Sequence, residues 1–276
     1  MMIGSLDYFT SLVEQDDDLP LFEAALAIAQ DADPEPDLIA TQAMIDSFAD
    51  QLNRRLTQDA AIIQKLRMLN HLFYEELGFA GNVNDYYDPD NSYLHRVLET
   101  RRGIPISLAV IYMELASQIG LEIKGVSFPG HFLMRLSLPA GEIVLDPFNG
   151  ASLSREELEE RLAPYVEQQP KLQLVDCLQA AHPRAILTRM LHNLKVLFFE
   201  RADWNQLLAV QQRLVILLPD DIAERRDRGL TFEQLECPQA ALEDLQAYLA
   251  DRPYAADADS LRAKLPNLRK ACSGLN

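Results

Sequence analysis

Apolar residues recur at spacings of three and four along most of the first hundred residues, which is the pattern of amphipathic helices. Leu66, Leu69 and Phe73 are examples of this spacing. The pattern predicts helices over residues 19–30, about 35–56 and 58–77, with the proline-containing stretch DADPEPD between the first two. The N-terminal region is therefore expected to be helical.

The period is lost after residue 77, in the stretch GFAGNVNDYYDPDNSY, whose Gly, Asn and Asp content predicts a loop. Asn91 or Ser92 is a suitable N-cap for a short helix that runs to about residue 99. Pro105 then opens a strongly apolar helix, because a missing N–H is tolerated in a first helical turn, and Gly120 ends it. A helix that is apolar all round is expected in the middle of a domain.

The period next changes to one typical of strands, predicted over residues 126–128, 131–138 and 142–145, the last two joined as a hairpin. Ser154, with a glutamate three residues later, predicts a capping box at the start of a further helix. These elements predict an α+β domain over residues 1–165.

A repeat follows, because Pro219 and Pro253 are 34 residues apart, which is the period of tetratricopeptide helix pairs. The predicted helices span residues 184–201, 204–217, 221–235 and 238–250. Residues 183–276 are therefore predicted to form tetratricopeptide-like α-helical hairpins, with the tail LRAKLPNLRKACSGLN as a cap.

The 276 residues include 25 Lys and Arg against 42 Asp and Glu, for a formal net charge of −17. Such a negative surface repels phosphate backbones and anionic lipid, so neither nucleic acid nor a membrane is expected as a partner. The first residues lack the pattern of a secretory signal, and no window reaches eighteen uninterrupted apolar residues. Three widely spaced cysteines fit reduced thiols, and a cytoplasmic location is expected.

Three segments stand in an order that carries candidate chemistry: a helix opening at GIPIS, a strand region with PGHF and a strand ending in LDPF. This order resembles the transglutaminase-like superfamily, whose papain-like fold places a Cys at a helix N-terminus and a His and an Asp on neighbouring strands. The His position falls on His131 and the Asp position on Asp146. The Cys position falls on Pro105, and Ser107 is the nearest hydroxyl, turned about 200° away along the helix.

More closely, the stretches YYDPDNSYL, RRGIPISLAVIY, FPGHFLMRL and LDPFNG resemble one bacterial family, the uncharacterised "SirB-one" type. The resemblance covers about residues 35–265 and implies a transglutaminase-like domain joined to C-terminal tetratricopeptide repeats. Because proline occupies the Cys position, the resemblance implies a pseudoenzyme rather than an active thiol enzyme.

Other residues have both a functional and a structural interpretation. Arg101 and Arg102 precede the positive end of the apolar helix and could bind an anion, or could be a solvated basic pair. Asn91 and Tyr93, with the tyrosines of the YYDPD stretch, could line a cleft or anchor the loop to the core. His131 and Asp146 could be a ligand-contacting pair or a structural pair, and Asp146 precedes a proline as turn-initiating residues do.

No metal-binding spacing and no nucleotide-binding motif occurs, so no metal or cofactor is expected. The preferred hypothesis is a non-catalytic regulatory or protein- or peptide-binding protein, with Pro105 and the His131–Asp146 pair in a degenerate cleft. The alternative is an amide hydrolase or acyl transferase in which His131 and Asp146 activate water or Ser107. A protein or peptide partner is expected, and the sequence predicts no oligomeric state.

Overall fold

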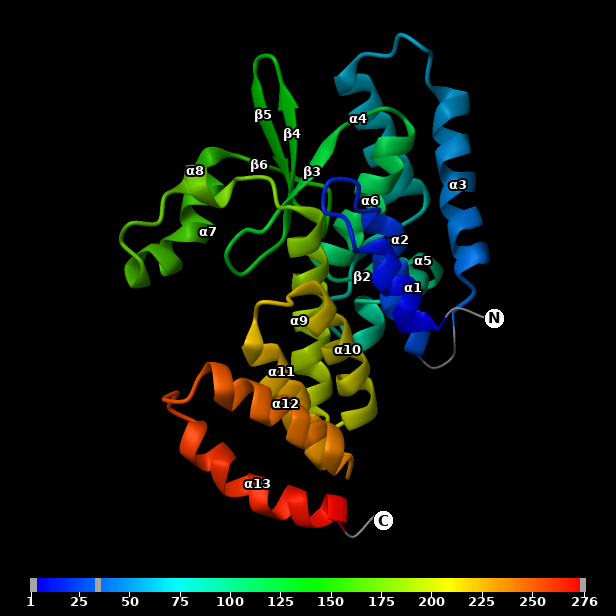
Figure 1. The fold of residues 1–276 in the computed structure, drawn as a ribbon. Helices are drawn as coiled ribbons and strands as arrows, with labels where there is room; N and C mark the ends of the chain where they lie inside the picture. Colours follow the sequence, from blue (N-terminus) through cyan, green and yellow to red (C-terminus); the bar gives the residue numbers. More distant parts are fainter. Residues whose placement is uncertain (1–3, 33–35, 274–276) are drawn as a thin grey trace. The chain divides into compact units, whose positions relative to one another are not determined.

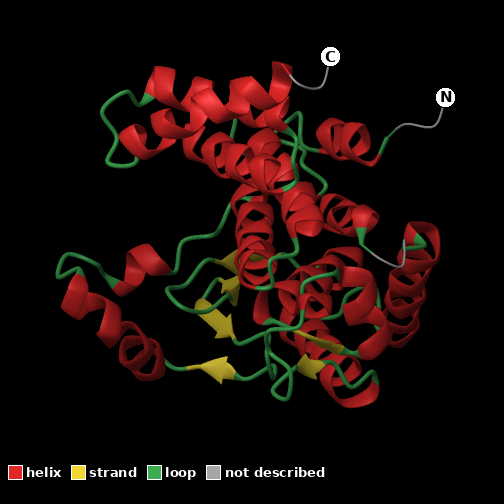
Figure 2. Ribbon diagram, turned by 90° about the horizontal axis from the view of Figure 1, so that it is seen from below, coloured by secondary structure: helices red, strands yellow, loops and turns green. Residues whose placement is uncertain are grey.

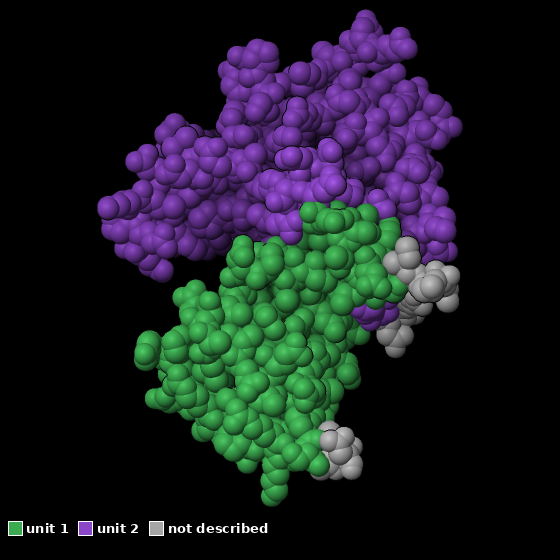
Figure 3. Space-filling view, viewed as in Figure 1, with its two compact units in different colours: residues 1–14, 191–276 green, residues 15–190 purple. Residues whose placement is uncertain are grey.

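The structure, a computed structural model, describes residues 4–32 and 36–273 of the chain. It divides into two compact units, residues 15–190 and residues 4–14 together with 191–273 (Figure 3). The division differs from the sequence-based boundaries of 1–165 and 183–276 in the placement of residues 4–14 and 166–190. The expected start of a helix at residue 35 lies outside the described residues.

Helices open the unit of residues 15–190, as the hydrophobic period predicts (Figure 1). They are α2 (Leu21–Ala27), continued by the 3₁₀ turn η1 (Ile28–Asp31), α3 (Leu38–Arg55), and α4 (Ile62–Asn70), continued by the π-helical turn η2 (His71–Glu76). Asp37 caps α3, because its side chain accepts a hydrogen bond from the Ala40 N–H at 2.9 Å. The three predicted helices are confirmed.

The next short helix, α5 (Leu94–Thr100), begins later than predicted. Its N-cap is Tyr93, so the expectation of an Asn91 or Ser92 cap is wrong. The reason is that residues 89–91 form a separate 3₁₀ turn, η3 (Pro89–Asn91), capped by Asp88, and the Asn91 side chain bonds to the preceding loop.

The apolar helix α6 (Pro105–Gln118) starts on Pro105 as predicted, and most of its residues are buried. Gly120 follows its C-terminus with a φ of +66°. The N–H groups of Gly120 and Leu121 bond to the carbonyls of Ser117 and Ala116, at 2.9 and 2.8 Å, which is the hydrogen-bond pattern of a Schellman cap. The helix forms part of the core of this unit.

An antiparallel sheet follows, in the order β3 (Ile123–Val126), β4 (Leu133–Leu138), β5 (Gly141–Leu145) and β6 (Ser152–Leu153). Met134 pairs with Leu145 in the predicted hairpin of β4 and β5. The structure differs from the prediction at residues 127–132, which turn between β3 and β4, so residues 127–128 and 131–132 are not in strands as predicted. In this turn, Phe128 N–H bonds to Val126 O, and His131 N–H bonds to Phe128 O. A short parallel pair, β1 (Ala80–Gly81) with β2 (Arg102–Gly103), was not predicted.

Two helices follow the sheet, α7 (Arg155–Gln168) and α8 (Leu174–Cys177). The predicted capping box of α7 is confirmed, since Glu157 N–H bonds to Ser154 Oγ and Ser154 N–H to the Glu157 carboxylate. Leu158 and Leu162 bring one face of α7 into an apolar cluster with Val126 and Leu133. Figure 2 shows that strands are few beside helices.

The repeat unit, residues 4–14 with 191–273, is helical. The helices at the predicted positions are α9 (Pro183–Glu200), whose first turns belong to the other unit, α10 (Trp204–Leu217), α11 (Ile222–Gln234) and α12 (Pro238–Asp251). A further helix, α13 (Ala258–Ser273), lies largely in the tail that was predicted as a cap. The N-terminal helix α1 (Ser5–Leu12) joins this unit because Phe9, fully buried, lies under the Arg213 guanidinium of α10. Among the described residues, no helix has the length and apolarity that a bilayer-spanning segment requires.

Candidate functional site

Asp146 lies at the end of β5, where the chain turns through residues 146–150. Its backbone N–H bonds to Ala151 O and its carbonyl accepts from Gly150 N–H, both at 2.8 Å. Gly150 has a φ of +74°, and a Cβ there would lie 2.5 Å from the Tyr74 ring. The turn therefore needs glycine for its backbone and for the close approach of Tyr74.

His131 is positioned by a second glycine turn. Gly130 has a φ of +68°, and a Cβ at this position would collide with the Tyr165 hydroxyl. The turn is further held by Arg189, whose guanidinium donates to Ser127 Oγ at 2.8 Å and to Phe128 O at 3.1 Å. The imidazole follows directly after this turn and precedes β4.

The two turns bring His131 and Asp146 into contact, with 2.9 Å between Nε2 and Oδ1. Oδ1 also accepts the Phe148 N–H at 3.0 Å, and Oδ2 accepts from Arg161 of α7 at 2.9 Å. Asp146 is 4% exposed, whereas the His131 side chain is 26% exposed. The carboxylate is thus enclosed by donors while the imidazole reaches solvent.

Burial alone would raise the pKa of Asp146, but the hydrogen bonds from His131, Phe148 and Arg161 outweigh it and lower that pKa to about 2. The carboxylate is therefore ionised at neutral pH, and it fixes the proton of His131 on Nε2. The other ring nitrogen, Nδ1, makes no hydrogen bond to any described residue and presents a lone pair. Burial and the Asp146 charge also raise the pKa of Tyr74.

Pro105 is the first residue of α6 and is buried. Ser107 is fully buried, and its hydroxyl lies 2.6 Å from Asn91 O and 2.9 Å from Ile104 O. A hydroxyl that donates to backbone carbonyls has its proton engaged there, so this geometry does not favour Ser107 as a nucleophile. Its contacts instead fix the start of α6 to the loop before α5.

Asn91 is 3% exposed, and its side-chain hydrogen bonds are with the preceding loop. Its amide donates to Asp85 O at 2.6 Å, and its Oδ1 accepts from the Asn82 amide at 2.9 Å. Tyr93 is buried beside His95, with 6.0 Å between ring centroids. These contacts are those of anchors that hold the loop to the core.

Arg101 lies between the rings of Phe48 and Phe79, with its guanidinium carbon 4.9 Å from each centroid. Its guanidinium also donates to Leu98 O. Arg102 is exposed and donates to Gly78 O at 2.7 Å. The hydrogen bonds of the two arginines thus lead to backbone carbonyls around β1 and α5 and to the Met44 sulfur, and none joins the His131–Asp146 pair.

Sequence reasoning missed four residues around the pair: Tyr74, Arg161, Tyr165 and Arg189. Arg161 and Tyr165 are four residues apart, so they share a face of α7, and the first bonds Asp146 while the second packs on Gly130. The four-residue spacing of Arg161 and Tyr165 was the one sequence signal that could have placed both side chains on the face of α7 toward the site. The exposed Tyr86 and Tyr87 pack edge-to-face on each other, with 5.4 Å between their centroids.

The comparisons with known proteins agree with this architecture. A family model described as transglutaminase-like superfamily matches residues 39–192, and a tetratricopeptide-repeat model matches residues 194–266. The protein is thus a transglutaminase-like domain followed by tetratricopeptide repeats, with an α+β fold and a helical C-terminal region. No solved structure matches it significantly.

The relatives are bacterial. The chain is 38% identical over 267 residues to a UPF0162 protein of Xylella fastidiosa, covering 95% of both chains. It is 33% identical over 230 residues to a UPF0162 protein of Pseudomonas aeruginosa, covering 83% of both. It is 30% identical over 223 residues to Protein SirB1 of Salmonella typhimurium, covering 80% of this chain and 81% of the relative. The chain belongs to the UPF0162 family, and the resemblance drawn from its sequence is confirmed.

Proposed function

We propose that this protein is a non-catalytic, regulatory binding protein whose His131–Asp146 site holds a peptide or another acyl-containing group without cleaving it. One observation carries the proposal: an ionised carboxylate orients an imidazole whose Nδ1 has no hydrogen bond to the described residues. The helix α6 begins with Pro105, where the superfamily resemblance puts the thiol. An oriented acceptor without a nucleophile is suited to binding an amide N–H.

The repeat unit provides the second contact surface in this proposal. Tetratricopeptide repeats commonly mediate protein–protein interactions, because stacked helix pairs present extended concave surfaces. The partner in the proposal is accordingly a protein or a peptide.

The test is binding of the full chain to an array of blocked hexapeptides, compared with a His131→Ala variant. A ligand that donates to His131 Nδ1 loses one hydrogen bond in the variant, so the affinity is expected to fall about tenfold. His71→Ala is the matched control, because His71 is a half-exposed histidine of the same unit that bonds only to surface glutamates. Equal binding by the wild-type and His131→Ala proteins would overturn the proposal.

The alternative function is an amide hydrolase or acyl transferase in which His131, oriented by Asp146, activates water. The contact of 2.9 Å between Nε2 and Oδ1 favours it, because such a pair is what a general base needs. Mass spectrometry of the peptides recovered from the array distinguishes the two. Hydrolysis products that disappear in His131→Ala would support the enzyme, whereas intact bound peptides support the binding protein.

A further inference from the structure

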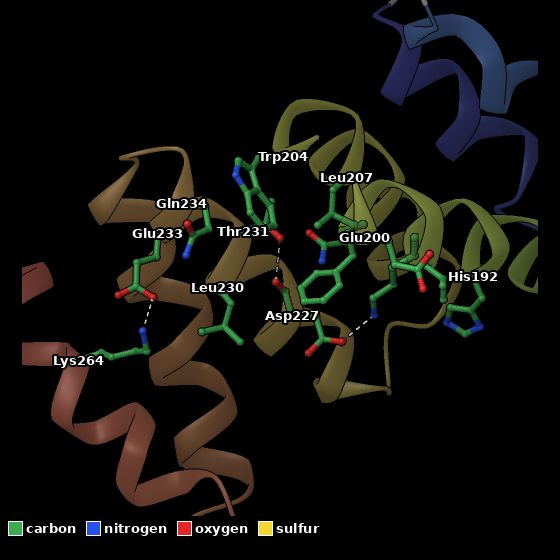
Figure 4. A pocket seen from close by; sticks show the side chains of 14 residues that line it. His192, Glu200, Trp204, Leu207, Asp227, Leu230, Thr231, Glu233, Gln234 and Lys264 are labelled. Atoms are coloured by element: carbon green, nitrogen blue, oxygen red, sulfur yellow. Dashed lines mark hydrogen bonds and ion pairs between the residues drawn. The ribbon is translucent and has the colours of Figure 1, made fainter. Parts of the chain in front are cut away.

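The repeat unit contains a pocket of about 830 Å³ between α9, α10, α11 and α13 (Figure 4). Its apolar lining comes mainly from Val196 and Phe199 of α9, Trp204 and Leu207 of α10, and Leu230 of α11. The lining residues lie within 192–264, and all of them except His192 fall in the region matched by the tetratricopeptide model, residues 194–266. It shares no residue with the His131–Asp146 site.

Large apolar side chains at this pocket are left in water. Val196 is 56% exposed and Phe199 is 64% exposed. Phe199 meets Trp204 edge-to-face, with 6.1 Å between ring centroids, so two aromatic rings stand at the pocket wall. Exposed aromatic rings beside a cavity form a surface on which a further ring can pack.

A buried acceptor without a donor also lines the pocket. Gln211 of α10 is 2% exposed, and its Oε1 has no hydrogen-bond partner among the described residues. A buried amide oxygen without a partner is unfavourable, so it favours any occupant that brings an N–H to it. The occupant is therefore expected to carry a hydrogen-bond donor in addition to an apolar group that packs on the pocket wall.

The charges around the pocket favour a cation. Lys195 is neutralised by Glu224 and Asp227, at 2.6 and 2.7 Å. Lys264 is likewise paired with Glu233 at 2.8 Å. Glu200, in contrast, is exposed and has no ion pair among the described residues. The available charge at the pocket is therefore negative, as is the whole chain at −17.

We propose that this pocket takes a tryptophan side chain from a basic segment of a partner protein. The indole ring packs on Phe199 and Trp204, and its N–H donates to Gln211 Oε1. An indole nitrogen only donates, so it meets the acceptor without adding an unpaired lone pair. A lysine or arginine near the tryptophan pairs with Glu200. The inference rests on the part of the proposed function that gives the repeats a contact surface.

The probe is a fluorescein-labelled, blocked peptide with one tryptophan among lysines and alanines, tested on the full chain by anisotropy. Methylation of the indole nitrogen is expected to weaken binding about tenfold, because it removes the donor. The Gln211→Met variant is expected to bind both peptides equally. Phe199→Ala is expected to weaken binding of the unmethylated peptide. Tyr254→Ala removes an almost fully exposed ring outside the pocket and is expected to leave the affinity unchanged.

The chain has a single tryptophan, so incorporation of fluorotryptophan gives one fluorine resonance, that of Trp204. This resonance is expected to shift when the peptide binds. Glu200→Gln is expected to weaken binding of the lysine-containing peptide and to reduce its dependence on salt. If Gln211→Met does not fold, the comparison of methylated and unmethylated peptides on the wild-type chain still decides the question.

Equal affinity for the methylated and unmethylated peptides, or binding without a Trp204 shift, would overturn the inference. Free indole that binds as tightly as the peptide would also overturn it, in favour of a small-molecule site. The His131→Ala variant separates the two proposals, because it is expected to bind this peptide normally. Loss of tryptophan-peptide binding alone would leave the His131–Asp146 proposal standing.

Discussion

Two buried carboxylates, Asp146 in the unit of residues 15–190 and Asp244 in the repeat unit, are 4% and 2% exposed. Asp244 accepts from Arg225 at 3.1 Å and from Arg228 at 2.7 and 2.9 Å. All these donors are side chains of α11, and the pairing links α11 to α12. Asp146 instead accepts from an imidazole whose second nitrogen makes no hydrogen bond to the described residues.

Burial of a charged group is therefore not, by itself, evidence of a functional site. Arginine ends the hydrogen-bond chain at Asp244, because a guanidinium only donates and has no acceptor to offer a ligand. Histidine extends the hydrogen-bond chain at Asp146, because the proton held on Nε2 leaves Nδ1 as an acceptor for a ligand. Among the described residues of the repeat unit, Gln211 has a buried acceptor with an unmet hydrogen bond, and it lines a pocket that Asp244 does not line.

The largest expected effect is on the structural carboxylate. Asp244→Ala leaves Arg225 and Arg228 without their partner, and removal of one partner from a buried pair costs several kcal/mol. Because both arginines are partly exposed, at 33% and 21% of their side chains, we expect a loss of about 3 kcal/mol. Urea denaturation of the variant measures it.

Asp251→Ala is the control in the same helix, because its pair with Arg252 is exposed and such pairs contribute about 0–1 kcal/mol. A loss for Asp244→Ala no larger than for this control would contradict the structural role of Asp244. Asp244 would then be no more important for stability than an exposed carboxylate of the same helix.

The next effect concerns Asp146 and depends on pH. Its carboxyl pKa is lowered from 3.8 to about 2 in the folded protein, so the stabilisation is present above pH 3.8 and is lost as the pH falls toward 2. This shift corresponds to about 2 kcal/mol. Wild-type protein is therefore expected to lose about 2 kcal/mol more than Asp146→Asn between about pH 5 and pH 2, measured by urea denaturation at each pH. An equal loss of unfolding free energy in the wild-type and Asp146→Asn proteins over this pH range would contradict the lowered pKa of Asp146.

The turn before His131 gives a smaller effect. Gly130→Ala must adopt a positive φ and also displace Tyr165, whereas Gly78→Ala must adopt a similar φ with no atom within 4 Å of the new Cβ. We expect Gly130→Ala to cost about 1.5 kcal/mol more than Gly78→Ala in thermal or urea unfolding. Replacing Tyr165 with Phe in the Gly130→Ala background should recover part of the difference, and no recovery would argue against the contact with its hydroxyl.

The sequence predicts the repeat unit well, because its signal is local. The helical period and the 34-residue spacing place α10 within the predicted 204–217 and α12 within one residue of 238–250. The addition of α1 to this unit depends on the contact of Phe9 with Arg213, which no local pattern encodes. The strands β1, β2 and β6 have two residues each, which is too short to show a hydrophobic period, so the sequence did not predict them.

The site shows the same limit. The contact of His131 with Asp146 could be expected from their order on a hairpin, because neighbouring strands bring such residues together. The contact of Arg161 with Asp146 could not be expected from the sequence, because it depends on where α7 packs after the sheet. Asn91 and Arg101 were grouped with candidate ligand contacts. In the folded chain, however, Asn91 bonds to the loop backbone and to the Asn82 amide, and Arg101 lies against aromatic rings.

The smallest expected effect compares helix caps in the two units. Ser154 caps α7 in a two-way capping box, whereas Asp203 caps α10 through one bond to Gln206 N–H at 3.2 Å. We expect Ser154→Ala to cost about 1 kcal/mol and Asp203→Ala about 0.5 kcal/mol in urea denaturation. Because α7 carries Arg161 to Asp146, Ser154→Ala is also expected to raise the pKa of Asp146, seen in its carboxyl carbon shift by NMR, while Asp203→Ala leaves that pKa unchanged. A pKa that does not respond to Ser154→Ala would mean that the apolar packing of Leu158 and Leu162, and not the cap, holds Arg161 in place.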